Sequence, residues 1–269
     1  MDAVLDFDLL LPPLKEQQRI VAILDEAFAG IATATANAEK NLQNASELFE
    51  SALQSVFAEK GDGWSEKPLR EICSIKHGFA FKGKDFSTNN DVSRPIVITP
   101  GNFTEDGRLR FTDKNTKRLS VKPPKEFVFG EGDLVIVMTD LSSKMKILGK
   151  PAFVEASNIL HNQRIGKVEL FDDSVDARLL YYFFMSEGFL CNVRETATGT
   201  MVKHTAPKRI LSNVLPYPKD SEAQKQVVEK LDALAEKVRI LKVIYEQKIE
   251  GLGQLKQSIL KKAFAGELH

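Results

Sequence analysis

Two long segments, one near each end of the chain, repeat each other, and this repeat constrains the fold more than any other feature. At one offset of 207 positions, "IVAILDEAFAGI" (20–31) aligns with "VVEKLDALAEKV" (227–238), and "SALQSVFA" (51–58) aligns with "SILKKAFA" (258–265). Because one offset serves both ends without a gap, the repeated segment has a constant length, as a continuous helix has. The repeat therefore predicts two long helices separated by a different element.

Apolar and small residues recur in both copies with alternating steps of three and four, the pattern of helices that pair along a heptad seam. Neither helix interior contains proline, and a helix over 16–58 would be about 64 Å long at 1.5 Å per residue. The residues predicted to form the interface of the helix pair are Ile20, Leu24, Ile31, Val227, Leu231, Leu234, Val238, Leu241, Leu252, Leu255 and Ile259.

Two arrangements would bury these apolar seams. Both helices could lie on one globular core, but such a helix is longer than a domain of about 155 residues, which is roughly 35–40 Å across. We favour antiparallel pairing of the two copies, because the first ends near residue 59, the second begins near residue 220, and the ends of a domain usually lie close together. The alanine-rich first copy would then face the bulkier second copy.

Charge is unevenly distributed although the formal net charge is zero. Residues 1–61 carry 4 Lys+Arg against 10 Asp+Glu, residues 62–217 carry 23 against 19, and residues 218–269 carry 10 against 8. The acidic first helix should attract the slightly basic second one weakly. The mildly basic middle segment has room for a local basic face that binds an anionic partner.

The cysteines and the N-terminal residues bear on the compartment. The two cysteines, Cys73 and Cys191, are far apart and belong to no CxxC or Cys/His cluster, which favours reduced thiols and argues against a zinc site. Asp2, Asp6 and Asp8 do not fit a signal peptide, and by inspection no apolar run approaches the roughly 18 residues that span a bilayer. We expect a soluble cytoplasmic protein without a membrane partner.

The middle segment reads as an α+β domain with curved strands. Short apolar runs between turn residues predict strands within 94–103, 104–111, 132–139, 150–156 and 164–171. Helical spacing follows over 176–195, with Asp176 as the predicted N-cap. "PKRILSNVLPYP" is interpreted as a short helix and a proline stop before the second long helix. The predicted divisions are a first helix within 1–60, a middle domain over 61–217 and a second helix within 218–269.

Catalytic motifs are absent from the sequence. There is no GxxxxGK[ST] and no GxGxxG after a strand, and the four histidines show neither metal-ligand spacing nor a Ser/Asp partner pattern. Asp140, followed by Ser142 and Ser143, is interpreted as a turn. We therefore predict no catalytic residue, no cofactor and no metal, and we disfavour a methyltransferase.

Four polar loops of the middle domain are candidates for nucleic-acid binding. "TATGTMVKHTAPKR" combines hydroxyls and cations around a glycine, and "HNQR" holds residue types that pair with adenine and guanine edges. "KHGFAFKGK" and "SSKMKILGK" interleave cations with apolar side chains. The predicted DNA-binding residues are Lys76, Lys82, Lys84, Lys144, Lys146, Asn162, Gln163, Arg164, Thr200, Lys203, His204, Lys208 and Arg209.

These segments resemble the specificity subunits of type I restriction-modification systems. "LPPLKEQQRIVAILDE" and "QLKQSILKKAFAGEL" are similar to the conserved helical regions of that family, and "GWSEKPLREICSIKHGFAFKGKDF" looks like the opening of its target recognition domain. "GDLVIVMTD" and "GTMVKHTAPKRILSNVLPYP" resemble later blocks of the same domain. The resemblance covers nearly the whole chain.

The resemblance implies a function in DNA recognition. A specificity subunit reads the bases of double-stranded DNA, holds two methyltransferase (M) subunits, is joined by a restriction (R) subunit through the complex, and has no catalysis of its own. Its helices would set the spacing between the two halves of the DNA target. An alternative from another class is a helical scaffold for protein interactions that lacks DNA specificity.

This sequence departs from the family pattern in one respect. Full-length members alternate two recognition domains with two helices, whereas here one recognition domain lies between the helices. Either a natural half-sized subunit or a fragment that begins artificially at Met1 would account for this. A single recognition domain would read one half-site, and a homodimer would read a symmetric two-part target.

Overall fold

The computed structural model describes residues 12–87 and 91–268. The chain divides into two compact units: one comprises Met1–Phe49 and Leu234–His269, and the other comprises Glu50–Ala233. We refer to them as the helical unit and the globular unit. The segment 1–11, which includes the leucines before the double proline, lies outside the described residues, as does His269.

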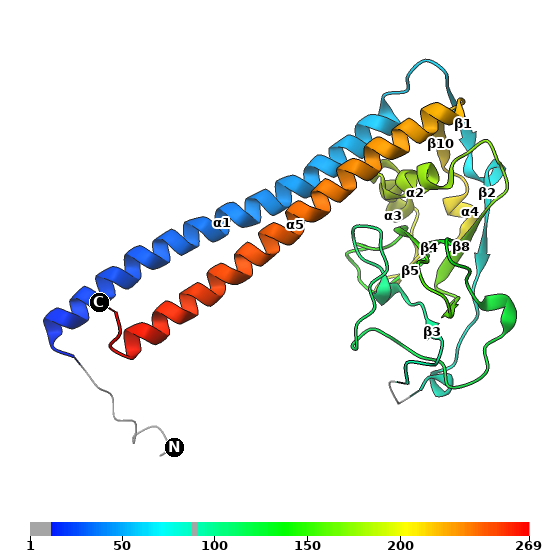
Figure 1. Ribbon diagram of the computed structural model, residues 1–269. Helices are drawn as coiled ribbons and strands as arrows, with labels where there is room; N and C mark the ends of the chain where they lie inside the picture. The colour runs from blue at the N-terminus through cyan, green and yellow to red at the C-terminus, as the bar shows by residue number, and fades with distance from the viewer. Residues whose placement is uncertain (1–11, 88–90, 269) are drawn as a thin grey trace. The chain divides into compact units, whose positions relative to one another are not determined.

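Two long helices, α1 (Leu14–Ala58) and α5 (Ser221–Phe264), run antiparallel (Figure 1), and most of each helix belongs to the helical unit. Nη2 of Arg19 donates a hydrogen bond of 2.6 Å to the carbonyl oxygen of Leu268. The ammonium of Lys256 lies 5.2 Å from the ring centroid of Phe28. Because residues that advance along α1 meet residues that recede along α5, these contacts establish the predicted antiparallel direction.

Small residues of α1 and larger residues of α5 line the buried side of the helical unit. Ala38 and Ala45 are buried on α1, and Val238 is buried on α5. Of the other predicted interface residues in this unit, the half-buried ones are Ile20, Leu24, Ile31, Leu234, Leu252 and Ile259. Leu241 and Leu255 are exposed.

The exposure of Leu241 has a local explanation. In "ILKVI" (240–244) four of five residues are apolar, so the sequence does not define which of them belongs to the seam. In the structure Lys242 and Tyr245 are half-buried, whereas Leu241 is exposed. The seam is therefore displaced by one position from the predicted pattern at this point.

Helix α1 is long and apolar enough to cross a membrane by length and composition alone. The same property is common in helices that bury one face against another helix. Within its apolar segment, Asp25 and Glu26 are exposed and Leu24 and Ile31 are half-buried. An apolar stripe on an amphipathic helix therefore accounts for the composition.

A four-stranded antiparallel sheet forms the centre of the globular unit, in the strand order β2-β8-β4-β6. Every residue of β4 is buried, as expected of a central strand with an uninterrupted apolar run. Gly166 lies opposite Ile136, and a Cβ at Gly166 would come within 2.5 Å of a methyl group of Ile75. The four strands are β2 (Cys73–His77), β8 (Ile165–Leu170), β4 (Leu134–Val137) and β6 (Pro151–Phe153).

A second sheet pairs β1 (Trp64–Pro68) with β10 (Val214–Pro218), which joins the two ends of the segment between the long helices. The prolines of 213–218 predict a stop before the second long helix, whereas in the structure Val214–Pro218 forms a strand. Pro216 and Pro218 occupy alternate positions of β10, and the intervening positions Leu215 and Tyr217 lie opposite Lys67 and Ser65 of β1. Proline is tolerated in such an edge strand because its missing N–H is not required there.

Helices α2 (Ala177–Met185) and α3 (Glu187–Glu195) occupy the segment predicted to have helical spacing. The carboxylate of Asp176 accepts hydrogen bonds from the backbone N–H groups of Arg178 and Leu179, which confirms the predicted N-cap. The segment contains two helices because Ser186 adopts an extended conformation between them. Other short strands and helices include β3 (Ile96–Val97), β5 (Thr139–Asp140), β7 (Ile159–Leu160), β9 (Lys203–His204) and α4 (Pro207–Ile210).

Strand prediction was least accurate before β4. Within 94–103 only Ile96–Val97 forms a strand, which pairs in parallel with β7. Within 104–111 there is no strand, and a single bridge joins Phe103 to Leu109. A tight turn at Gly107, whose φ is +78°, interrupts the apolar run and prevents a longer ladder.

The first turns of α5 belong to the globular unit. Gln224 is buried: its side chain accepts a hydrogen bond of 2.8 Å from the N–H of Asp176 and donates to the carbonyl oxygens of Ser174 and Pro218. Two turns later, Asp232 accepts hydrogen bonds from Nη2 of Arg178, at 2.5 Å, and from the hydroxyl of Tyr182. These polar contacts, together with buried Val228 and Leu231, attach α5 to α2 and its flanking loop.

Candidate nucleic-acid interface

A two-residue antiparallel ladder between β5 and β9 organises the first half of the candidate interface. Thr139 lies opposite His204, and Asp140 lies opposite Lys203. Oγ1 of Thr139 is 3.0 Å from Nδ1 of His204, although the two residues are 65 positions apart in the sequence. The ladder therefore holds the loop that follows β5 beside the loop that precedes β9.

The loop before β9 is a closed turn over 198–204. Thr198 and His204 exchange two backbone hydrogen bonds, each of 2.9 Å. Gly199 has a φ of +96°, and a Cβ at this position would lie 2.0 Å from the carbonyl oxygen of Val202. Only glycine fits at this position, and the resulting tight turn presents Thr200 to solvent.

The loop after β5 is held by the carboxylate of Asp140. This side chain is buried, and its two oxygens accept hydrogen bonds from the N–H groups of Ser142, at 2.8 Å, and Ile147, at 3.1 Å. The predicted turn at Asp140 is thus present, and the turn continues as a ring that ends at Ile147. Lys144 and Lys146 are exposed on this ring.

A second pair of loops brings together the segments 77–81 and 161–164. Phe79 forms a parallel bridge with Asn162: its N–H donates to the carbonyl oxygen of His161, at 2.8 Å, and its carbonyl accepts from the N–H of Gln163, at 3.1 Å. A Cβ at Gly78 would come within 2.4 Å of the carbonyl oxygen of His161. The glycine of the predicted "KHGFAF" loop is therefore what permits the contact with "HNQR".

Side chains within "HNQR" have different accessibility. Gln163 and Arg164 are exposed, whereas Asn162 is buried and its Oδ1 accepts a hydrogen bond of 2.9 Å from the N–H of Arg164. His161 is also buried, and its Nε2 lies 2.8 Å from the carbonyl oxygen of Ile165. Burial lowers the pKa of His161, which favours the neutral imidazole. Gln163 and Arg164 are consequently the members of this loop that can reach a ligand.

Met138 connects the two loop pairs. Its N–H donates to the carbonyl oxygen of Arg164, and its carbonyl accepts from the N–H of Thr205, both at 2.9 Å. Lys208 and Arg209 follow Thr205 on the short helix α4, where Nη1 of Arg209 donates to Oγ1 of Thr198 at 3.2 Å. The predicted loops around 79, 139–147, 161–164 and 198–209 therefore form one continuous surface, which we call the loop surface.

Some cations of this region form ion pairs with carboxylates, and others do not. Lys76 lies 2.7 Å from a carboxylate oxygen of Glu169, and Lys146 lies 2.8 Å from one of Glu105. In the part of the chain that the structure describes, no such pair engages four other predicted cations, which are Lys144, Arg164, Lys203 and Lys208. Lys82 and Lys84 occupy the turn over Gly83–Asp85, further along the first loop.

Exposed apolar side chains within the loop surface were missed by the sequence analysis. Leu141 follows β5, and Met201 and Val202 precede β9, all three exposed. Polar and charged residues are the usual ligands of DNA, and these three residues are neither. The signal that could have found them is an apolar pair inside a hydroxyl-rich loop, where burial is not expected.

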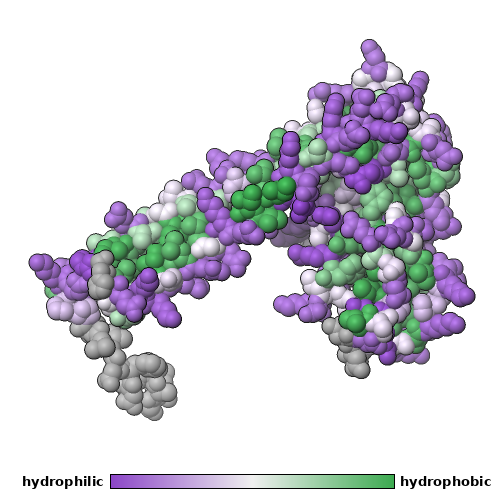
Figure 2. All heavy atoms as spheres, in the orientation of Figure 1, coloured by the Kyte–Doolittle hydropathy of each residue, from purple (hydrophilic) through white to green (hydrophobic). Residues whose placement is uncertain are grey.

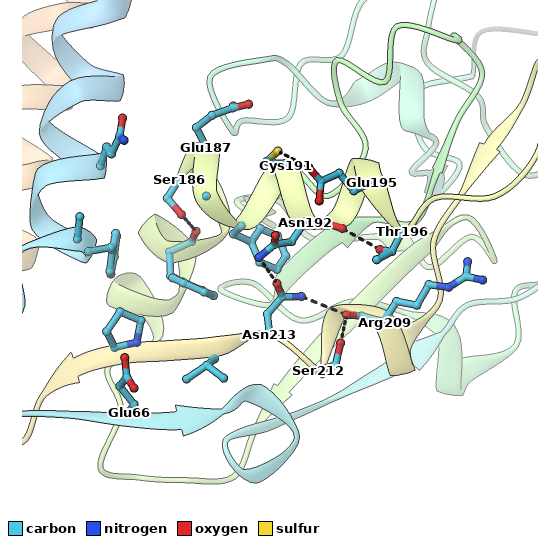
Figure 3. Close-up of a pocket in the computed structure, with 18 of the residues that line it drawn as sticks. Glu66, Ser186, Glu187, Cys191, Asn192, Glu195, Thr196, Arg209, Ser212 and Asn213 are labelled. Atoms are coloured by element: carbon cyan, nitrogen blue, oxygen red, sulfur yellow. Dashed lines mark hydrogen bonds between the residues drawn. The ribbon is translucent and has the colours of Figure 1, made fainter.

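A groove of about 780 Å³ in the globular unit adjoins the loop surface and shares Arg209 with it (Figure 3). Its floor includes Phe183 and Phe189, and Glu187 and Cys191 lie on its rim. The rim groups bond to neighbouring residues: Glu187 accepts from Nη1 of Arg194 at 2.6 Å, and the Cys191 thiol donates to Glu195 at 3.4 Å. The hydrogen bond to Glu195 raises the pKa of the Cys191 thiol, which favours the unreactive protonated form.

Clusters of metal-ligand type are also absent from the described residues: no group of three or more His, Cys, Asp or Glu side chains is close enough to hold a metal ion. A basic loop surface on an α+β domain that is bounded by two long helices is typical of a nucleic-acid recognition module. Residues 61–250 match the family described as type I restriction modification DNA specificity domain, and the chain belongs to this family.

Two curated proteins illustrate the similarity in sequence. The chain is 27% identical over 224 residues to the type I restriction enzyme EcoBI specificity subunit of Escherichia coli, covering 82% of this chain and 43% of that protein. It is 25% identical over 271 residues to the type I restriction enzyme MjaVIII specificity subunit of Methanocaldococcus jannaschii, covering 96% and 61% respectively. The chain thus spans less than two thirds of the length of either relative.

Solved structures show the same fold. The HsdS subunit from Thermoanaerobacter tengcongensis superimposes with a TM-score of 0.57 at 22% identity, over 96% of this chain and 60% of that one. A chain from a structure of a type I R-M system superimposes with a TM-score of 0.72 at 22% identity, over 96% and 61%. The order of a long helix, a mixed α/β domain and a second long helix is therefore that of known specificity subunits.

Proposed function

We propose that this chain reads DNA sequence for a type I restriction-modification complex. The observation that carries the proposal is the continuity of the loop surface across Met138, which brings segments from four parts of the sequence into one basic patch. Membership of the specificity family supports the same reading. The chain itself supplies binding and no catalysis, cofactor or metal, and it acts in the cytoplasm, where its DNA target is.

Different residues of the loop surface would serve different parts of the duplex. Gln163 and Arg164 are exposed side by side, and their amide and guanidinium groups match the hydrogen-bonding edges of adenine and guanine. Lys144, Lys203 and Lys208 are cations on flexible stems that suit phosphate oxygens. Phosphate contacts make binding to duplex DNA depend steeply on salt, whereas the base contacts set the sequence preference.

The exposed side of α5 in the helical unit would hold the methyltransferase subunits. Ile240, Leu241, Val243 and Ile244 are all exposed there, and Figure 2 shows apolar side chains gathered along the helices. So many neighbouring apolar residues are unusual on a surface that faces only water, and they suit a partner helix. A restriction subunit would join through the methyltransferase subunits.

The length of the helices would also set the distance between the two halves of the DNA target. Helix α1 has 45 residues and α5 has 44, which corresponds to about 66 Å at 1.5 Å per residue. One turn of B-DNA is about 34 Å, so helices of this length suit half-sites more than one turn apart. With one recognition domain the chain reads one half-site, and a second copy in a homodimer supplies the other.

The experiment is to co-express the chain with candidate methyltransferase subunits and to map the methylated sites. We expect a defined site, and an Arg164→Ala variant should methylate it about 10-fold less efficiently because one base contact is lost. Arg94→Ala is the matched control, since Arg94 lies outside the loop surface and pairs with Asp91. Methylation without any site preference would contradict the proposal.

The alternative function is a helical scaffold without DNA specificity. The exposed apolar residues of α5 favour it as much as they favour a specificity subunit, because both need a partner protein. The same co-expression separates the two. A scaffold would retain the methyltransferase subunits after Arg164→Ala and would confer no methylation site in either form.

A further inference from the structure

Three apolar side chains protrude together from the loop surface. Met201 is 80% exposed, Leu141 is 59% exposed and Val202 is 37% exposed. Asp140 lies opposite Lys203 in the β5–β9 ladder, so the next positions outward on the two strands are Leu141 and Val202. The three residues therefore belong to adjoining tips of two loops, which we call the apolar tip.

The backbone beneath the apolar tip is held in place. The turn that carries Met201 is closed by two hydrogen bonds between Thr198 and His204, and Gly199 allows the close approach of the Val202 carbonyl. The turn that follows Leu141 is closed by both oxygens of the Asp140 carboxylate. A preorganised backbone presents an apolar tip at low entropic cost on binding.

Positive charge surrounds the apolar tip. Lys203 adjoins Val202, Lys144 lies on the neighbouring ring, and Arg164 is linked through Met138. The carboxylate of Asp140 is buried, and each of its oxygens accepts a backbone hydrogen bond, whereas the exposed carboxylate of Glu105 is paired with Lys146. An apolar projection on a surface that also carries these cations complements duplex DNA, whose phosphates lie outside and whose base stack is apolar.

We propose that the apolar tip is a wedge that enters a groove of the bound duplex, where Met201 presses on a base step and bends the DNA. This inference rests on the proposed function, since it needs DNA at the loop surface. Apolar side chains inserted at a base step unstack it partly and kink the duplex by tens of degrees. The step that bends most easily would then be preferred without any hydrogen bond to its bases.

The test uses the chain assembled with its methyltransferase subunits and a duplex that contains the mapped site. Met201→Ser is compared with Val121→Ser, an exposed apolar residue outside the loop surface, and with Lys203→Ala. Affinity is measured for the target and an unrelated duplex at several salt concentrations, and bending is measured by energy transfer between dyes at the duplex ends.

Met201→Ser should weaken target binding about 10-fold, lower the energy transfer, and leave both the salt dependence and binding to unrelated DNA unchanged. Lys203→Ala should weaken both duplexes alike and reduce the salt slope by about one. Wild-type affinity and energy transfer in Met201→Ser would overturn the wedge, as would loss of the methyltransferase subunits in that variant. Failure of the wild type to prefer any duplex would instead contradict the proposed function.

Discussion

Matching residues of the two helical repeats lie in different surroundings. At the offset of 207 positions, Val21 corresponds to Val228, but Val21 is 54% exposed in the helical unit and Val228 is 7% exposed in the globular unit. Asp25 is exposed, whereas its counterpart Asp232 accepts hydrogen bonds from Arg178 and Tyr182.

The repeated sequence therefore predicts that both segments form helices, but it does not predict which other parts of the protein pack against each helix. Helical periodicity is the same in both copies, since it depends on residues three and four positions apart. Burial depends on what packs against the helix: residues 228–232 of α5 pack beside α2, whereas residues 21–25 of α1 belong to the helical unit. The same residue type should therefore contribute differently to stability in the two copies.

The largest expected loss of unfolding free energy is at Leu231, which corresponds to Leu24 in the first copy of the repeat. Leu231→Ala should lower the free energy of unfolding of the globular unit by about 2–5 kcal/mol, because a buried side chain is lost and leaves a cavity. Its matched control is Leu24→Ala, at the half-buried counterpart in the helical unit. Urea unfolding is followed by the fluorescence of Trp64, the single tryptophan, which lies in β1. Equal shifts of this transition in both variants would contradict the claim that the two matching leucines contribute differently to stability.

A smaller effect is expected at the glutamines. Gln224→Leu removes three hydrogen bonds and leaves the N–H of Asp176 and two carbonyl oxygens without that partner, which should cost about 2–3 kcal/mol. In Gln17→Leu the lost bond is to the carbonyl oxygen of Pro12, and the Trp64 transition should stay in place. An equal loss of unfolding free energy in Gln17→Leu and Gln224→Leu would contradict the comparison.

The smallest effect depends on pH and involves Tyr182. Burial, and then the hydrogen bond to Asp232, raise the pKa of Tyr182. Its stabilising contribution is complete below about pH 10, the value for an unfolded tyrosine, and is lost as the pH rises above it, because the unfolded chain ionises first. Tyr182→Phe should cost about 1 kcal/mol at neutral pH.

The pH dependence gives this prediction a clear check. The difference in unfolding free energy between wild type and Tyr182→Phe should narrow above about pH 10, because only the wild type has this tyrosine to ionise on unfolding. Asp25→Asn is the matched control, because Asp25 is exposed in the other copy of the repeat. If the difference in unfolding free energy between wild type and Tyr182→Phe stays constant above about pH 10, burial and the hydrogen bond to Asp232 do not raise the pKa of Tyr182.

Local patterns were sufficient to predict several elements. The N-cap at Asp176 and the turn at Asp140 each depend on a side chain that bonds to backbone within a few residues, so the sequence signal is complete. Strand β4 was predicted because a buried central strand is a continuous apolar run. The choice of the loop cations as DNA ligands stays a prediction, which rests on the concentration of hydroxyls and lysines in loops that have no role in a core.

Other features could not be predicted because they depend on distant partners. Pro216 and Pro218 indicated a stop, yet pairing with β1, about 150 residues earlier, makes them part of a strand. Asparagine is a residue type that contacts DNA bases, but the side-chain oxygen of Asn162 accepts a hydrogen bond from the backbone N–H of Arg164. Met201 has no local signal of function, because its exposure depends on the closed turn around it.

The sequence by itself determined the two long helices, their constant length, the α+β domain between them and the basic character of its loops. Each of these follows from periodicity, composition or short-range bonding. Tertiary structure alone decided that the loops after β5 and before β9 adjoin, that Val228 is buried while Val21 is exposed, and that an apolar tip stands among cations. The physical reason is that these properties require contacts between segments tens of residues apart, which no local pattern records.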